Sequence, residues 1–356
     1  MQSVSRHWTW VAPAVGWALI AGSFGFAVPA VALGVGLIAT VLAAVHHAEL
    51  IAHKVGEPFG TFVLAVAVTV IELGLIITLM SAGGKDAATL ARDTVFAAVM
   101  IILNGLIGIC ILVGALRHRE QIFQQTGVSA SLAALCALTV LTLVLPNFTI
   151  SERGPVYSPS QLAFVAVVSF LLYATFVSVQ TVRHRDYFLP SRDASDVEVH
   201  ADPPTLRATV VSSLLLIASL VAVVLLAKTL AKPVETAVAA WGAPRTVVGV
   251  IIAALVLLPE SIAAVRAAFA NRLQTSLNLG LGSALATIGL TIPAVAALSL
   301  TLQLPITLGL DAKSTVLLFL TLLVATLSLG TGRTTILQGA VHLMIFGVYL
   351  FTTVVP

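Results

Sequence analysis

TFVLAVAVTVIELGLIITLM, residues Thr61–Met80, is an apolar stretch with one charged side chain, Glu72, near its middle. A second stretch, TVVGVIIAALVLLPESIAAVRAAF at Thr246–Phe269, carries Glu260 in a similar central place. About 20 apolar residues in an α-helix cross the hydrocarbon core of a bilayer, so both glutamates are predicted to lie near its midplane. A carboxylate is costly there and usually faces a cavity, a partner or an ion path. The two stretches therefore predict a helical membrane protein with a shared ion site.

The composition agrees with a polytopic membrane protein. The chain is 59% hydrophobic and 9% charged, whereas soluble domains are about 25% charged. Its mean hydropathy is +1.07. The net charge of +3 is small, and the basic residues lie mainly between apolar segments, so they indicate topology and not nucleic-acid binding. Cys110 and Cys136 both fall within apolar segments and are expected to be packing residues, with neither a disulfide nor a metal site implied.

The apolar segments predict an all-α protein with about eleven membrane spans. The first segment is interpreted as a span, and not as a signal peptide, because glycines and Pro29 interrupt it. The only long hydrophilic stretch, Arg183–Pro204, divides the chain near its midpoint. The predicted spans cover, approximately, residues 8–26, 29–52, 60–80, 94–116, 128–145, 161–182, 206–230, 246–269, 276–300, 314–329 and 336–355.

The distribution of basic residues predicts the orientation of these spans. With the N-terminus in the cytoplasm and the C-terminus outside, the cytoplasmic segments hold 11 of the 18 lysines and arginines. A peripheral first helix (1–27) then precedes two sets of five spans, 28–182 and 206–356, which are joined by a cytoplasmic linker (183–205). The two sets have opposite topology, and each carries its glutamate in its second span. This is the layout of an inverted-repeat secondary transporter.

Glu72 and Glu260 together suit cation exchange. A hard cation such as Ca²⁺ takes carboxylate, carbonyl and water oxygens as ligands, and two carboxylates balance its charge. The same carboxylates favour protons when the ion leaves, because they are desolvated and repel each other. The alternative is that each glutamate only bonds a polar neighbour inside the bundle. Pro259 is expected to break its helix and free a carbonyl, and Thr69 lies one turn before Glu72, where it either ligates or bonds its own helix.

Further polar residues are candidates for this or a second site. Asn104 and Ser283 lie in the fourth and ninth spans, and we expect them to ligate the cation or to orient its ligands. His46, Glu49 and His53 share a helical face near the predicted cytoplasmic boundary. They are interpreted as gating or proton-access residues, with a plain polar helix end and a catalytic metal site as alternatives. His342 is isolated in the last span and is expected to be packed or hydrogen-bonded.

Three segments resemble the cation/calcium exchanger superfamily. HAELIAHKVGEPFGTFVLAVAVTVIE (47–72) and ARDTVFAAVMIILNG (91–105) are similar to its first alpha-repeat, here about 56–116. LLPESIAAVRAAFANRLQTSLNLGLGSALATIGLTIP (257–293) is similar to the second, here about 246–300. The similarity is closest to the bacterial ChaA-type calcium/proton antiporters and covers nearly the whole chain. It implies eleven spans, cation- and proton-binding roles for Glu72 and Glu260, and positions lining the site for Asn104 and Ser283.

The chain departs from this family near both carboxylates. Many relatives carry Gly-Asn ahead of each glutamate, whereas Val70-Ile71 and Leu258-Pro259 stand here. The resemblance predicts Ca²⁺ export in exchange for H⁺ across the cytoplasmic membrane. The departures leave exchange of Na⁺ or K⁺ for H⁺ on the same fold as the alternative. The lipid bilayer and inorganic cations are the expected partners, and no cofactor is expected. A passive channel and an intramembrane enzyme using His46, Glu49 and His53 are two further alternatives.

Overall fold

The computed structural model describes residues 7–56, 59–83, 88–189, 204–244 and 246–355, and these residues are almost entirely helical. The chain forms two compact units. The first contains Met1–Ala87 and Glu198–Val248, and the second contains Ala88–Val197 and Gly249–Pro356. Each unit therefore combines segments from both halves of the chain. The predicted division into a peripheral helix, a linker and two repeats concerns topology, not packing, and it stays a prediction.

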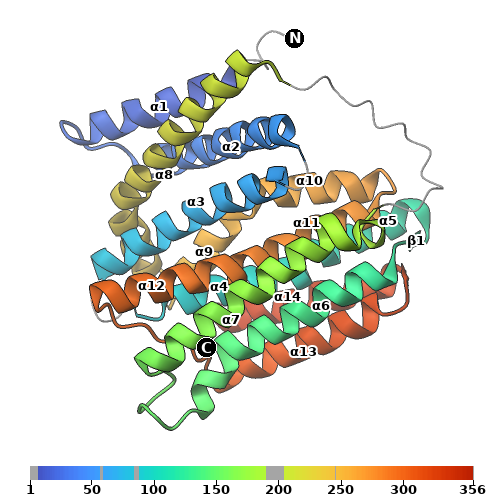
Figure 1. Ribbon diagram of the computed structural model, residues 1–356. Helices are drawn as coiled ribbons and strands as arrows, with labels where there is room; N and C mark the ends of the chain where they lie inside the picture. The colour runs from blue at the N-terminus through green and yellow to red at the C-terminus, as the bar shows by residue number, and fades with distance from the viewer. Residues whose placement is uncertain (1–6, 57–58, 84–87, 190–203, 245, 356) are drawn as a thin grey trace. The chain divides into compact units, whose positions relative to one another are not determined.

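The first unit is built around α2 (Ala30–Val55). This helix packs against α1 (Trp8–Ser23), α3 (Phe59–Gly83) and α8 (Leu206–Ala240), as Figure 1 shows. Small residues bring these helices close together. A Cβ atom on Gly74 of α3 would lie 2.4 Å from the Val224 side chain of α8. The absence of a side chain at Gly74 therefore lets α3, which carries Glu72, approach α8 directly.

The second unit has a buried central span made of α4 (Leu90–Met100), the π-helical segment η3 (Ile101–Leu106) and α5 (Ile107–His118). Within this span, 83% of the residues in the most apolar window are buried. Around it lie α6 (Gln125–Thr139) with η4 (Val140–Val144) and η5 (Leu145–Phe148), α7 (Pro159–Ser178) with η6 (Val179–Arg183) and η7 (Arg185–Tyr187), α9 (Thr246–Val256), α10 (Leu258–Phe269), α11 (Leu273–Ala286), η8 (Thr287–Thr291), α12 (Ile292–Leu302), α13 (Ala312–Leu329) and α14 (Ile336–Val354).

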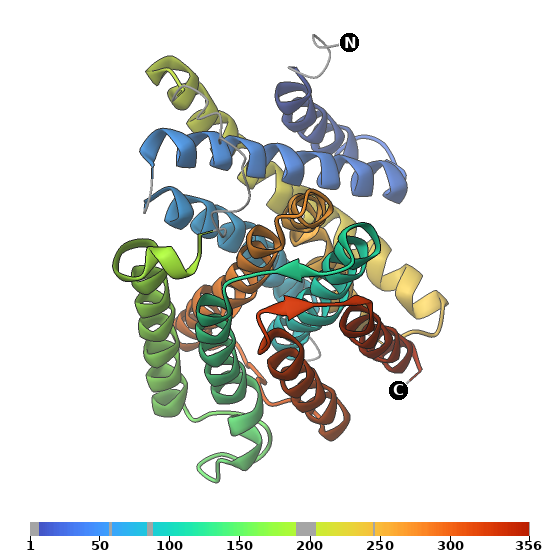
Figure 2. The same cartoon turned by 90° about the vertical axis from the view of Figure 1, so that its right-hand side faces the viewer.

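Two short strands fasten one end of the second unit. β1 (Gln121–Ile122) pairs antiparallel with β2 (Arg333–Thr334), and the two arrows lie side by side in Figure 2. Gln121 is buried, and its amide nitrogen donates to the carbonyl of Ala268 at 3.0 Å and to Asn271 Oδ1 at 3.0 Å. These bonds hold the C-terminal end of α10 against the strand pair.

The eighth predicted span is broken next to Pro259. α9 and α10 meet at Leu257 with a bend of 57°. Pro259 has no N–H, so the carbonyl of Leu255 loses the donor that a regular helix would supply. The N–H of Ser261 bonds the Leu257 carbonyl at 2.9 Å, so the helix resumes directly after the break. The prediction of a break at Pro259 is confirmed.

Within the described residues, eight helical segments are long and apolar enough to cross a membrane, or nine if the bent α9–α10 pair is one span. The predicted number of eleven therefore stays a prediction. α1 has only 16 residues and would reach about 24 Å along its axis. Within α3, the segment Val66–Thr78 is apolar but shorter than the eight spanning segments.

Two predicted boundaries need correction. The seventh span was expected to end near Leu230, but α8 continues to Ala240, because Ala, Lys and Glu favour a helix and Pro233 is accommodated inside it. The first span was expected to reach Phe26, but α1 ends at Ser23, with Gly22 in its last turn and Gly25 in the turn that follows. Residues 190–203 of the predicted cytoplasmic linker lie outside the described residues.

Candidate functional site

Glu72 occupies the interior of the first unit. It lies in the middle of α3 and is 2% exposed, among the buried apolar side chains of Ile71, Leu75 and Ile76. Thr69 lies one helical turn earlier and is 7% exposed. Thr69 and Glu72 therefore share a buried face of α3, as the spacing predicts. An ionised carboxylate in such surroundings is costly unless hydrogen bonds, a bound cation or a proton satisfy it.

Glu260 occupies a different kind of position in the second unit. It lies in the first turn of α10, immediately after the broken point of the span, and is half-buried. The N-terminus of a helix carries partial positive charge, which favours a carboxylate in the first turn. The break therefore places Glu260 in the middle of a span, about one turn after the Leu255 carbonyl that Pro259 leaves without its usual helical donor. That combination is typical of ion sites in transporters.

The second unit also gathers the elements that carry Asn104 and Ser283. α10 contacts η3 and α11, and α11 contacts η3, so the three elements that bear Glu260, Asn104 and Ser283 pack against one another. Asn104 is fully buried, and Ser283 is half-buried. A Cβ atom on the neighbouring Gly282 would meet nothing within 4 Å, so the backbone beside Ser283 has open space next to it.

The structure does not place all five predicted site residues in one unit. Glu260, Asn104 and Ser283 belong to the second unit, whereas Glu72 and Thr69 belong to the first. A site shared by both glutamates therefore stays a prediction. Among the described residues, no three His, Cys, Asp or Glu side chains lie where they could hold one metal ion.

The predicted gating residues lie on the outer side of α2. His46, Glu49 and His53 are all exposed. Their neighbour His47, which belongs to the same polar cluster in the sequence but received no predicted role, is 2% exposed and bonds two other helices of the first unit. The proline at position 13, which leaves a helix carbonyl without its donor, is the signal that could have identified it. The gating role of the exposed trio stays a prediction.

His342 is a second buried histidine, and it is hydrogen-bonded as expected. Its Nδ1 lies 3.3 Å from Asn104 Oδ1, and its Nε2 lies 2.7 Å from Ser328 Oγ. The sequence alone does not connect His342 to Asn104, because 238 residues separate the two positions. Nothing in a single sequence signals such a contact.

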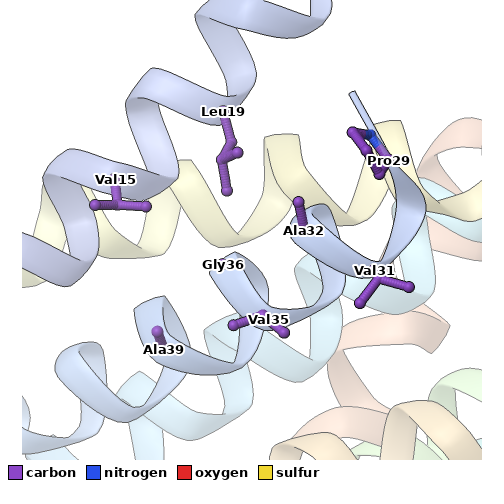
Figure 3. A pocket seen from close by; sticks show the side chains of 8 residues that line it. All are labelled: Val15, Leu19, Pro29, Val31, Ala32, Val35, Gly36 and Ala39. Atoms are coloured by element: carbon purple, nitrogen blue, oxygen red, sulfur yellow. The ribbon is translucent and has the colours of Figure 1, made fainter. Parts of the chain in front are cut away.

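The first unit also has an open pocket of about 510 Å³ between α1 and α2 (Figure 3). Its lining is apolar and includes Leu19, Pro29 and Val35. Such a lining offers no oxygen ligands to a cation, so the pocket is not part of an ion site.

The chain matches the sodium/calcium exchanger protein family over residues 25–182 and 211–355. It belongs to that family. Among its relatives, the y4hA protein of Sinorhizobium fredii is 48% identical over 365 residues, covering 100% of this chain and 99% of that protein. The sodium-potassium/proton antiporter ChaA of Escherichia coli is 34% identical over 320 residues, covering 89% and 86%.

Solved structures share the exchanger fold at lower sequence identity. YfkE, a Ca²⁺/H⁺ antiporter, superposes with a TM-score of 0.74 and 17% identity over 98% of this chain and 100% of its own. The H⁺/Ca²⁺ exchanger CAX superposes with a TM-score of 0.72 and 14% identity over 98% and 89%. The family assignment makes this exchanger a multi-pass membrane transporter of inorganic cations and removes the intramembrane-enzyme alternative.

Proposed function

We propose that this exchanger exports Ca²⁺ from the cytoplasm in return for H⁺, with Glu72 and Glu260 binding cation and protons in turn. Two observations support the proposal. The chain belongs to a cation-exchanger family, and Glu72 is a carboxylate at 2% exposure in an apolar helix. The second observation carries the mechanism, because burial disfavours a bare ionised carboxylate and so favours a bound cation or a bound proton.

Neutralisation by one of two ligands produces coupling. A buried carboxylate without a counter-charge is costly, so the state in which Glu72 is ionised and empty is sparsely populated. Glu72 would therefore change from cation-bound to protonated only as one ligand replaces the other. If Glu260 does the same, one Ca²⁺ exchanges for two H⁺. Alternating access then converts the proton gradient into cation export, and no cofactor takes part.

Exchange of Na⁺ or K⁺ for H⁺ is the second candidate. It is favoured by the 34% identity to ChaA, a sodium-potassium/proton antiporter. It is also consistent with Val70-Ile71 and Leu258-Pro259 ahead of the two glutamates, since none of these side chains offers an oxygen ligand. Both candidates assign the same roles to Glu72 and Glu260 and differ only in the ion.

The proposed location is the cytoplasmic membrane, with the N-terminus inside and the C-terminus outside. The excess of lysine and arginine in the segments that this orientation assigns to the cytoplasm supports it. The orientation would place the 183–205 linker in the cytoplasm.

The test is proton flux in inside-out vesicles that carry a fluorescent pH probe. Ca²⁺, Na⁺ and K⁺ are added in turn to wild type, Glu72→Gln and Glu260→Gln. We expect Ca²⁺-evoked proton movement in wild type and its loss in both variants, because glutamine is similar in shape but does not exchange a proton. Glu152→Gln is the matched control, since Glu152 is exposed in the loop before α7.

Each outcome decides a specific point. Normal flux in either variant would contradict the site assignment. Responses to Na⁺ or K⁺ alone would select the monovalent antiporter. Cation flux without counter-movement of protons would favour a passive channel.

A further inference from the structure

A fully formed polar cluster lies in the core of the second unit, apart from the predicted carboxylates. It consists of Asn104 on η3, Thr321 and Ser328 on α13, and His342 on α14, and we name it the Asn104 cluster. Asn104, Thr321 and His342 are 0% exposed, and Ser328 is 6% exposed. Three membrane spans meet in this cluster, and two of them are the last two of the chain.

The hydrogen bonds of the cluster fix the orientation of each group. Asn104 Nδ2 donates to Thr321 Oγ1 at 2.9 Å, and the Thr321 hydroxyl donates to Met100 Sδ at 3.4 Å. The carboxamide oxygen of Asn104 therefore faces His342 and can only accept. His342 Nδ1 then carries the proton, and the Ser328 hydroxyl lies within hydrogen-bond distance of both His342 Nε2, at 2.7 Å, and the Ala325 carbonyl oxygen, at 3.3 Å. The tautomer with the proton on Nδ1 satisfies both bonds of the imidazole.

Two glycines make this contact reachable. A Cβ atom on Gly108 would lie 3.0 Å from the His342 Cβ and 3.1 Å from Leu343 Cγ. A Cβ atom on Gly339 would lie 2.8 Å from the backbone nitrogen of Leu112. α14 therefore lies directly on the backbone of α5, close enough for an imidazole on α14 to reach a side chain on η3.

One member of the Asn104 cluster lies in a π-helical turn. Asn104 lies in the middle of the π-helical segment η3, one of several π-helical turns in the described residues; single π-helical turns inside α-helices are frequent at functional sites. η3 also packs against α10, the helix that carries Glu260 in its first turn. A change in the position of η3 would therefore change its packing against α10, which carries Glu260, within the same unit.

We propose that His342 is a positioning residue for ion exchange. Its imidazole, oriented by Ser328, holds the Asn104 carboxamide and so keeps η3 in place against α10. The effect on transport rests on the proposed function. The stabilisation of η3 by the His342–Asn104 hydrogen bond does not depend on it.

Two substitutions separate the two hydrogen bonds of the imidazole. The amide of asparagine reproduces the position of Nδ1, so His342→Asn keeps the bond to Asn104 and gives up the bond to Ser328. The longer glutamine reproduces the position of Nε2, so His342→Gln keeps the bond to Ser328 and gives up the bond to Asn104. Both variants retain a neutral polar group at the same buried position, and the pair controls for burial and polarity.

The test measures KM and maximal rate for Ca²⁺-driven proton flux, with Na⁺ and K⁺ as further probes, together with deuterium uptake of residues 101–106 in purified protein. We expect His342→Gln to raise KM roughly tenfold, which corresponds to one lost hydrogen bond, and to speed deuterium uptake at η3. His342→Asn should leave both values near those of wild type. In an Asn104→Ala background, His342→Gln should have no further effect on KM.

Equal KM values and equal uptake in the two variants would overturn the inference, even if both variants melt at lower temperature than wild type. A wild-type protein that moves no protons in response to any cation would instead refute the proposed function. In that case, deuterium uptake of residues 101–106 would still test whether His342 keeps η3 in place. Faster uptake in His342→Gln alone would support this role, and equal uptake in the two variants would contradict it.

Discussion

Thr9 has a backbone carbonyl that its own helix cannot satisfy. The donor four residues later would be Pro13, which has no N–H. His47 Nε2 lies 3.1 Å from this carbonyl, and Nδ1 lies 3.3 Å from Ser212 Oγ. Since a carbonyl only accepts, Nε2 donates to Thr9 and Nδ1 accepts from Ser212. One buried histidine on α2 therefore satisfies the unpaired Thr9 carbonyl of α1 and also bonds Ser212 of α8.

This repair gives a prediction at the residue scale. His47→Leu should lower the free energy of unfolding by about 1–2 kcal/mol, because it leaves a buried carbonyl and a hydroxyl without partners. The loss should be smaller in a Pro13→Ala background, where the N–H of the new alanine can bond the Thr9 carbonyl. Thermal unfolding in detergent, followed by tryptophan fluorescence, measures both effects.

His46→Leu provides the matched control, since His46 is the exposed neighbour on the same helix. Its unfolding temperature should stay close to that of wild type. A similar loss in His46→Leu and His47→Leu would show that burial of the His47 bonds does not matter.

At the scale of elements, glycines decide how closely helices approach in the second unit. A Cβ atom on Gly339 of α14 would meet the backbone of α5, at 2.8 Å from Leu112 nitrogen and 3.0 Å from the Gly108 carbonyl oxygen. Backbone atoms cannot turn aside as a side chain does. The α5–α14 contact therefore tolerates no side chain at this position, which is typical of helix pairs in membranes.

Gly339→Ala should accordingly destabilise the protein by about 1–3 kcal/mol through overpacking. It should also reduce transport, because it pushes α14 and its His342 away from Asn104. Gly347→Ala on the same helix is the control, since a Cβ atom there would meet nothing within 4 Å. The comparison of unfolding temperature and flux in the two variants tests the prediction, and equal behaviour would contradict it.

At the scale of the whole molecule, the proposed exchange requires protons and cations to compete for the same carboxylates. Raising the pH removes the competing protons, so the KM for Ca²⁺ should fall as the pH rises and then level off. Two competing protons would change KM by roughly a hundredfold per pH unit on the acidic side, and one by roughly tenfold.

Initial rates of ⁴⁵Ca²⁺ uptake into inside-out vesicles, measured over a range of pH and Ca²⁺ concentration, give this dependence. In Glu72→Gln, the KM of any residual uptake should depend on pH as if at least one fewer proton competed with Ca²⁺. A KM that does not change with pH would exclude a shared site for protons and Ca²⁺.

The sequence by itself determined the class of the protein and most of its elements. Long apolar segments fix membrane spans because the bilayer leaves the backbone no other way to satisfy its hydrogen bonds. The break at Pro259 and the isolated glutamates were likewise readable, since a missing N–H and a charge in an apolar helix are local properties. The family followed from residues around Glu72, Asn104 and Glu260, and residues 25–182 and 211–355 match it.

Only the tertiary structure decided how distant polar residues are used. Asn104 was predicted as a position lining the ion site, and the structure adds that its carboxamide is held by Thr321 and His342, which lie 217 and 238 residues away. His47 and His46 are adjacent in sequence, yet one is buried and bonded and the other is exposed. The physical reason is the same in both cases. A buried polar group takes whichever partner packing brings to it, and helical periodicity in one span carries no information about the neighbouring span.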